Sequence, residues 1–122
     1  MNKSQALHNF WSSFGLKAYE QNSIPDDAVL PYITYETASD SLGNVLPLTA
    51  SLWYRSNSWT AISQKAEEIA KYLEEVYPIS QAIDGGRMYI ARGTPFAQRM
   101  SDTDTTIKRI VLNIAVEFFT AY

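Results

Sequence analysis

The side chains of this sequence that could act as acid, base or nucleophile do not fall into a known catalytic spacing. His8 is the sole histidine of the chain and lies in a segment with helical periodicity. A histidine base needs a nucleophile within hydrogen-bonding reach, and no cysteine or serine signature surrounds His8. Asp26 and Asp27 are adjacent, so in an extended segment their carboxylates point apart and do not converge on a substrate. We expect a structural histidine and a solvated aspartate turn.

Metal and nucleotide motifs fail at their diagnostic positions. Asp102-Thr103-Asp104 has the opening of a calcium loop, but Ile107 stands where glycine is needed and Asn113 where glutamate is needed. Gly85-Gly86 and Gly93 do not have the spacing of a phosphate-binding loop. The sequence contains no cysteine, which excludes disulfides, thiolate nucleophiles and cysteine zinc sites. The sequence therefore predicts no catalytic residue, no metal and no cofactor, and a protein that is not an enzyme.

Composition sets the broad class. A length of 122 residues predicts a single domain over 1–122. Hydrophobic residues make up 46% of the chain without an apolar run long enough for a membrane span, so we expect a soluble protein without a membrane partner. The first residues lack the pattern of a signal peptide, so we expect the protein to stay in the cell that makes it. A net charge of -3 makes nucleic acid an unfavourable primary ligand.

The first half of the sequence predicts a helix and a hairpin. Apolar residues at helical spacing predict a helix over 3–14, ended by Gly15. β-branched and aromatic residues predict strands over 32–37 and 46–55, joined by turn residues at 39–44. In the second strand, alternate residues from Leu46 to Tyr54 share one face, which we expect to face the core.

The second half predicts one secure helix and two more strands. An apolar stripe opposite lysines and glutamates predicts a helix over 58–77 that starts at Asn57 or Ser58. Strands are expected over 87–92 and 106–119, separated by a long loop from Gly93 to Thr105. The predicted fold is α+β in α-β-β-α-β-β order, an antiparallel or mixed sheet of about four strands with two helices on one face.

Two sets of side chains follow from these expected faces. Burial should unite residues of the second helix and of two strands in one core: Ile69, Leu73, Leu52, Leu112 and Ile114. The opposite strand faces leave candidates for exposed apolar surface, which soluble monomers tend to avoid: Trp53, Tyr35, Val111 and Phe119. Self-association is the expected consequence.

The expected loop is the strongest candidate for an interface. It combines aromatic, methionine and arginine side chains, the types enriched in interface cores, with two aspartates. The candidate interface residues are Arg92, Phe96, Arg99, Met100, Asp102 and Asp104 of the loop region, with Trp53 and Arg55 of the preceding strand. The alternative is that Phe96 packs back onto the sheet and has no partner outside the chain.

Four segments together resemble one protein family. They are Phe10-Trp11-Ser12-Ser13-Phe14-Gly15, the stretch from Ile24 to Tyr35 that contains LPYITY, the stretch from Thr49 to Ser56 that contains LWYRS, and Gly93-Thr94-Pro95-Phe96-Ala97-Gln98. These segments resemble the tail terminator, or tail completion, proteins of siphophages and of prophages in Gram-positive bacteria. The similarity extends over nearly the whole chain and carries no catalytic motif.

The resemblance implies a structural subunit of a bacteriophage or prophage virion. Such a subunit forms a ring, usually a homohexamer, which ends polymerisation of the tail tube and offers a surface for head-tail joining. The implied partners are further copies of the chain, the tail tube protein and the head-completion or connector protein, with DNA only passing through the ring. The implied location is the host cytoplasm during virion assembly and then the head-proximal end of the tail.

Two other functions remain open from the sequence. The first is another head-tail connector or a tail-tube-like protein, which would stack into tubes where a terminator forms single rings. The second is a small-molecule-binding or enzymatic α+β domain, which would need a deep pocket lined by Trp53, Tyr54 or Tyr89.

Overall fold

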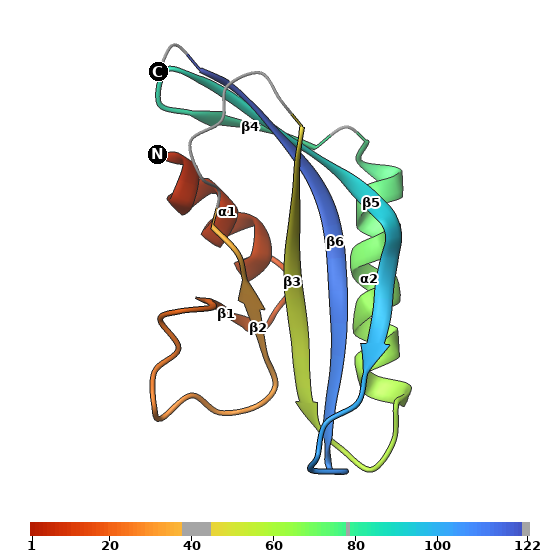
Figure 1. Ribbon diagram of the computed structural model, residues 1–122. Helices are drawn as coiled ribbons and strands as arrows, with labels where there is room; N and C mark the ends of the chain where they lie inside the picture. The colour runs from red at the N-terminus through yellow and green to blue at the C-terminus, as the bar shows by residue number, and fades with distance from the viewer. Residues whose placement is uncertain (38–44, 78, 121–122) are drawn as a thin grey trace.

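One curled, six-stranded sheet in the order β1-β2-β3-β6-β5-β4 organises the chain (Figure 1). The computed structural model describes residues 1–37, 45–77 and 79–120. In chain order the elements are α1 (Lys3–Ser12), β1 (Lys17–Glu20), β2 (Tyr32–Tyr35), β3 (Leu46–Arg55), α2 (Thr60–Glu75), β4 (Ile79–Ile83), β5 (Gly86–Met100) and β6 (Ile107–Thr120). The expected turn at 39–44 lies outside the described residues.

The predicted four-stranded sheet in α-β-β-α-β-β order is wrong. Two additional strands, β1 and β4, lie at the two ends of the sheet order, so the chain runs α-β-β-β-α-β-β-β. The sheet is mixed because β1 pairs with β2 in parallel, whereas the other neighbouring strands are antiparallel. Both new strands are short, with four and five residues.

The predicted long loop from Gly93 to Thr105 is also wrong. Strand β5 continues through it to Met100, with a shift in its pairing with β6 between Arg92 and Ala97. Such a shift is a β-bulge, in which extra residues leave the ladder without ending the strand. Gly93 belongs here because a Cβ atom at this position would lie 2.9 Å from Asn113 of β6. The turn-forming residues therefore bend a strand, and the loop is confined to 101–106.

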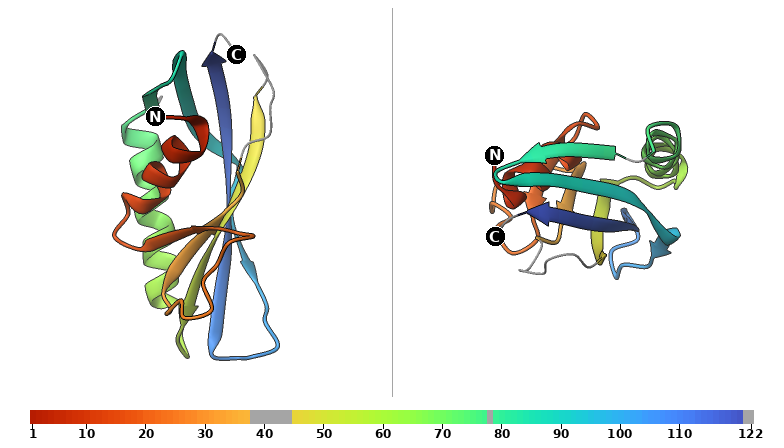
Figure 2. Two further views of the ribbon diagram at one scale, coloured as in Figure 1. Left: turned by 90° about the vertical axis from the view of Figure 1, so that its left-hand side faces the viewer. Right: turned by 90° about the horizontal axis from the view of Figure 1, so that it is seen from above.

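The sheet has two different faces. Both helices pack against one of them, which we call the helix face; the other is the outer face (Figure 2). On β6 every second residue from Ile110 to Phe118 is buried against the helices, while the residues between them are half-buried. The five core residues expected from the sequence are all buried in one cluster, which confirms that prediction.

Local capping sets the ends of the helices. Helix α1 begins with a capping box in which Asn2 accepts from the Gln5 amide and the Gln5 side chain accepts from the Asn2 amide. It ends shortly before Gly15, whose φ of 83° is the left-handed geometry expected there. Helix α2 differs from expectation because its N-cap is Trp59 and makes no side-chain bond, although Ser58 Oγ accepts from the Thr60 amide.

Candidate protein interface

The outer face carries a row of side chains that crosses most of the sheet. Tyr32 lies opposite Trp53, Trp53 opposite Arg109, and Arg109 opposite Met100. The Arg109 guanidinium lies 4.6 Å from the centre of the Trp53 ring, within the range of a cation-π contact. The Trp53 indole N–H donates to Thr34 Oγ1 at 2.9 Å. Trp53 is therefore a fixed, half-buried aromatic platform on this face.

The loop 101–106 is held against the end of β3 by Arg55. The Arg55 guanidinium donates to Thr106 Oγ1 at 2.9 Å and lies 3.5 Å from the Asp104 carboxylate. Asp104 also accepts from both the amide and the hydroxyl of Thr106. These hydrogen bonds from Thr106, with a smaller effect of the Arg55 charge, lower the pKa of Asp104. Asp104 of the loop thus contributes to the fold through contacts within the chain.

A hollow of ≈ 600 Å³ lies between the end of β3 with the loop 101–106 and the segment that precedes β2. Trp53, Arg55 and Asp102 line it on one side, and Val29 with Tyr32 lines it on the other. Val29 is 78% exposed, an unusual environment for a branched apolar side chain that has no part in the core. A hollow with an aromatic floor, an apolar rim and both charges suits contact with another protein surface.

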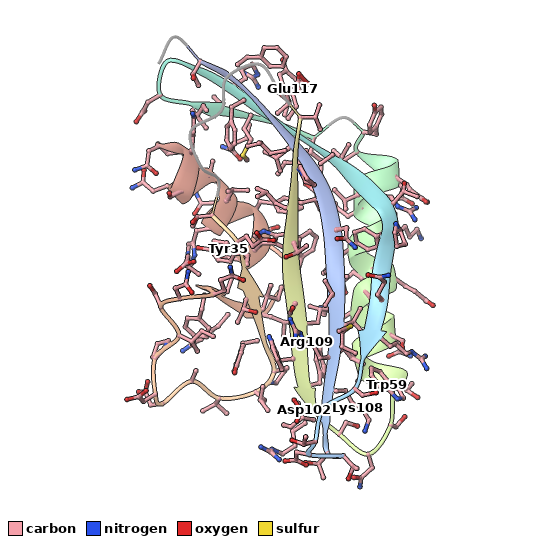
Figure 3. The ribbon with its side chains drawn as sticks, viewed as in Figure 1. Tyr35, Trp59, Asp102, Lys108, Arg109 and Glu117 are labelled. Carbon is pink, nitrogen blue, oxygen red and sulfur yellow. The ribbon has the colours of Figure 1, made fainter. Side chains whose placement is uncertain are left out.

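Arg99 lies on the opposite side of the sheet and contacts α2. Its guanidinium lies 4.8 Å from the centre of the Trp59 ring and donates to Ser63 Oγ at 3.3 Å. The Lys108 ammonium lies 5.6 Å from the same ring. Figure 3 shows Trp59, Lys108, Asp102 and Arg109 toward the lower end of the molecule. Arg99 therefore shares this end with Trp53 and Arg55 but lies on the helix face.

Phe96 and Arg92 form a separate pair higher on β5. Phe96 is only 7% exposed and belongs to the core cluster, so in a single copy of the chain its ring packs against the sheet, and its part in an interface stays a prediction. Arg92 forms an ion pair with Glu74 of α2, and its guanidinium lies 5.3 Å from the Phe96 ring centre. Met100 is 42% exposed at the end of β5.

The four apolar residues expected to be exposed differ in their actual exposure. Tyr35 is buried, which contradicts its expected exposure, whereas Phe119 is 51% exposed, as expected. Trp53 and Val111 are half-buried. A hollow of ≈ 550 Å³ lies on the outer face around Tyr89 and Phe119, whose rings meet edge to face at 5.5 Å.

Val29 and Arg109 were not among the candidate interface residues, and the sequence indicates them only weakly. Val29 is an apolar residue within a turn-like, acidic segment, a position where solvent exposure is the simplest expectation. Arg109 and Trp53 belong to separate strands, and their contact depends on the register of β3 with β6, which the sequence alone does not fix.

The remaining chemical candidate is a chain of three polar side chains at α1. His8 Nε2 lies 3.3 Å from Ser12 Oγ, and His8 Nδ1 lies 3.1 Å from the Tyr35 hydroxyl. The serine lies at the C-terminal end of α1, where backbone carbonyls carry negative partial charge and would destabilise an oxyanion. The arrangement instead satisfies the hydroxyl of buried Tyr35, whose pKa is raised by burial and by the nearby charge of Glu20.

Within residues 1–37, 45–77 and 79–120, no three or more histidine, aspartate or glutamate side chains gather where they could bind a metal ion. None of the helices in these ranges is long and apolar enough to cross a membrane.

Comparison with known proteins shows a likeness of fold and no likeness of sequence. The sequence matches no protein-family model and no curated protein. The fold is similar to that of a chain in the virion of a native gene transfer agent particle, with a TM-score of 0.59 and 10% sequence identity. The likeness covers 83% of this chain and 77% of the virion chain. At this identity the comparison establishes a shared fold for most of both chains.

Proposed function

We propose that this protein is a structural subunit of a phage-type virion and, more specifically, a tail terminator that forms a hexameric ring. The observation that carries the proposal is the fold shared with a chain of a gene transfer agent virion, over most of both chains. The resemblance of the LPYITY and LWYRS segments to tail terminators points to the same class. The proposed role is non-enzymatic, with tail tube and head connector as partners.

The surface of the molecule supports a role in assembly. Exposed apolar side chains are found at both ends of the sheet, with Val29 at one end and Phe119 at the other. Glu117, drawn at the upper end in Figure 3, is the charged residue lining the hollow around Phe119. An assembly protein needs separate contact regions for its own copies and for the layers above and below it. The two hollows on the outer face support this role as candidate contact regions.

Electron microscopy of the purified protein, alone and mixed with tail tubes, tests the proposal. We expect single-layer rings with sixfold symmetry, which seat at one end of each tube and stop its growth. Tubes that grow from the protein alone would favour the alternative of a tube-like component. Dispersed monomers that leave tail tubes unchanged would refute the ring.

A pair of matched variants tests whether the outer face takes part. Val29→Asp places a charge at a highly exposed apolar position, so it should leave the melting temperature unchanged while weakening tail completion. Gln64→Asp introduces the same side chain at an exposed position of α2 and should behave as wild type in both measurements. Equal tail completion by both variants would remove the Val29 hollow from the interface.

A further inference from the structure

The sheet has an open edge on each side, and the two edges differ. Strand β1 ends the sheet order on one side. On the other side, β4 pairs with β5 only from Gly86 to Ile90. Beyond Ile90, no other strand of the described residues pairs with the outer edge of β5, which forms the right-hand rim of the sheet in Figure 1.

The distal end of β5 is a regular strand with one free side. Ala97 to Met100 pair in register with Leu112 to Arg109 of β6, and all four residues are exposed. Alternate residues of an antiparallel strand direct their N–H and C=O groups to the side away from their partner. An exposed row of such groups is a template for another strand. Helix α2 does not occupy this side, because it reaches Arg99 from the helix face.

Strand β1 offers the complementary side. Among the strands of the described residues, β2 alone pairs with Lys17 to Glu20, and the carbonyl of Glu20 accepts from the Ser23 amide. A hollow of ≈ 470 Å³ lies between α1 and β1, lined by His8, Ser12 and the stretch from Gly15 to Tyr19. An incoming strand therefore finds both unpaired backbone and open space beside β1.

We propose that the free edge of β5 in one copy pairs with the free edge of β1 in the next copy, so that the sheets continue from subunit to subunit. This inference rests on the proposed ring and identifies its contact. The paired segments are Ala97–Met100 and Lys17–Glu20, which have the same length. Because the two edges are different surfaces, the contact is head-to-tail, the type that closes into rings.

The strand directions within one chain fit this contact. Strand β1 runs parallel to β2, and each following step from β2 through β3 and β6 to β5 reverses direction, so β1 and β5 run in opposite senses. Rotation about a ring axis that lies along the strands preserves these directions. Strands β5 and β1 of neighbouring copies then meet antiparallel, the more stable pairing.

The side chains fit as well. Lys17 and Gln98 both lie on the outer face, as the registers through Tyr32 and Val111 show. Glu20 and Arg99 both lie on the helix face, so the junction brings opposite charges to one side of the continued sheet. Complementary charge at a repeated contact favours the correct neighbour over other alignments.

Disulfide cross-linking is a direct test, because the sequence contains no cysteine of its own. Antiparallel pairing of the two segments over their full length sets Tyr19 opposite Gln98, so the double variant Tyr19→Cys with Gln98→Cys places two thiols opposite each other on the outer face. Three intervening strands separate these positions within one chain, so a bond must join two copies. Lys17→Cys with Met100→Cys tests the same register at the next outer-face pair, and Lys17→Cys with Gln98→Cys tests a register shifted by two residues. We expect at least one of these pairs to give a ladder of covalent oligomers, lost on reduction.

The controls separate this contact from other ways of associating. Lys17→Cys with Glu67→Cys moves one thiol to the exposed side of α2 and should give no ladder. Each single-cysteine variant should stay uncrosslinked, because head-to-tail contact keeps identical residues apart. Efficient dimers from Gln98→Cys alone would show two β5 edges paired with each other and would overturn the proposal.

Failure of the edge contact can be told from failure of the ring. If no register yields a ladder while electron microscopy of the same samples shows rings, the edge pairing is wrong and the ring stands. If ladders and rings are both absent, the edge pairing and the proposed ring are refuted together.

Discussion

Replacing Leu112 by alanine should remove a large part of the stability of this fold. Leu112 is 0% exposed and lies on the helix face of β6. Its cross-strand neighbours are Ala50 on β3 and Ala97 on β5, both too short to fill the vacated space. The lost burial of about three carbon groups costs roughly 2.4 kcal/mol at about 0.8 kcal/mol each. The unfilled cavity adds to this, so we expect a total loss of about 3–5 kcal/mol.

The assay is urea unfolding followed by circular dichroism, at protein concentrations where variant and wild type have the same oligomeric state. Val111→Ala is the matched control, since it truncates the neighbouring residue on the outer face, which is half-buried. We expect Val111→Ala to cost less than about 1.5 kcal/mol, because partly exposed groups lose less burial on truncation. Equal losses for the two variants would refute the assignment of the two faces.

Three further outcomes follow from the structure. Phe96→Ala should lower the free energy of unfolding by about 3–5 kcal/mol in the same urea assay, because the ring is buried in the bulge. Thr106→Val should move the pKa of Asp104 upward in a carboxyl NMR titration, since the hydroxyl hydrogen bond is lost. In the wild type, ionised Asp104 stabilises the loop at pH values above the ordinary aspartate pKa. This stabilisation is lost as the pH falls through the lowered pKa of the folded state. Arg92→Gln should cost less than about 1 kcal/mol by thermal unfolding, as an exposed ion pair with Glu74 contributes little.

The long periodic elements could be predicted from the sequence. Helix α2 has a continuous apolar stripe, and β6 alternates from Ile110 to Phe118, so the spacing alone indicates each element. Strand β3 was predicted with its observed bounds. In each case the elements are long enough for the period to stand out from random variation.

The short edge strands lack such a pattern. Strand β1 reads Lys-Ala-Tyr-Glu, with Ala18 as its one buried residue. Strand β4 has buried isoleucines at its two ends, Ile79 and Ile83, with a serine, a glutamine and an alanine between them. Each strand depends on pairing with a neighbour. For β1 the neighbour is β2, which is distant in sequence, and for β4 it is β5, which follows across a turn. Such pairing can override the local preference of the residues.

The expected loop from Gly93 to Thr105 was wrong because its turn-forming residues lie within a strand. Gly93, Thr94 and Pro95 have the composition of a loop, but in the structure they form a bulge within β5. The sequence left open whether Phe96 faces a partner or packs onto the sheet, and in the structure its ring is buried in the core. The arginines and aspartates are interface candidates because of their residue types. Their contacts within the chain depend on the cross-strand register, which residue type does not determine.

The close approach of Gly93 to Asn113 has a consequence for how this sequence can diverge. Any side chain at position 93 would meet the Cβ and the backbone of Asn113 at 2.9 Å. Asn113 in turn donates from its side-chain amide to the Pro95 carbonyl at 2.9 Å, which secures the bulge. A sequence that keeps the bulge should therefore keep glycine at position 93, because the close contact includes the backbone of Asn113. Related sequences that lose this glycine should also lose the asparagine and, with it, the bend in the strand.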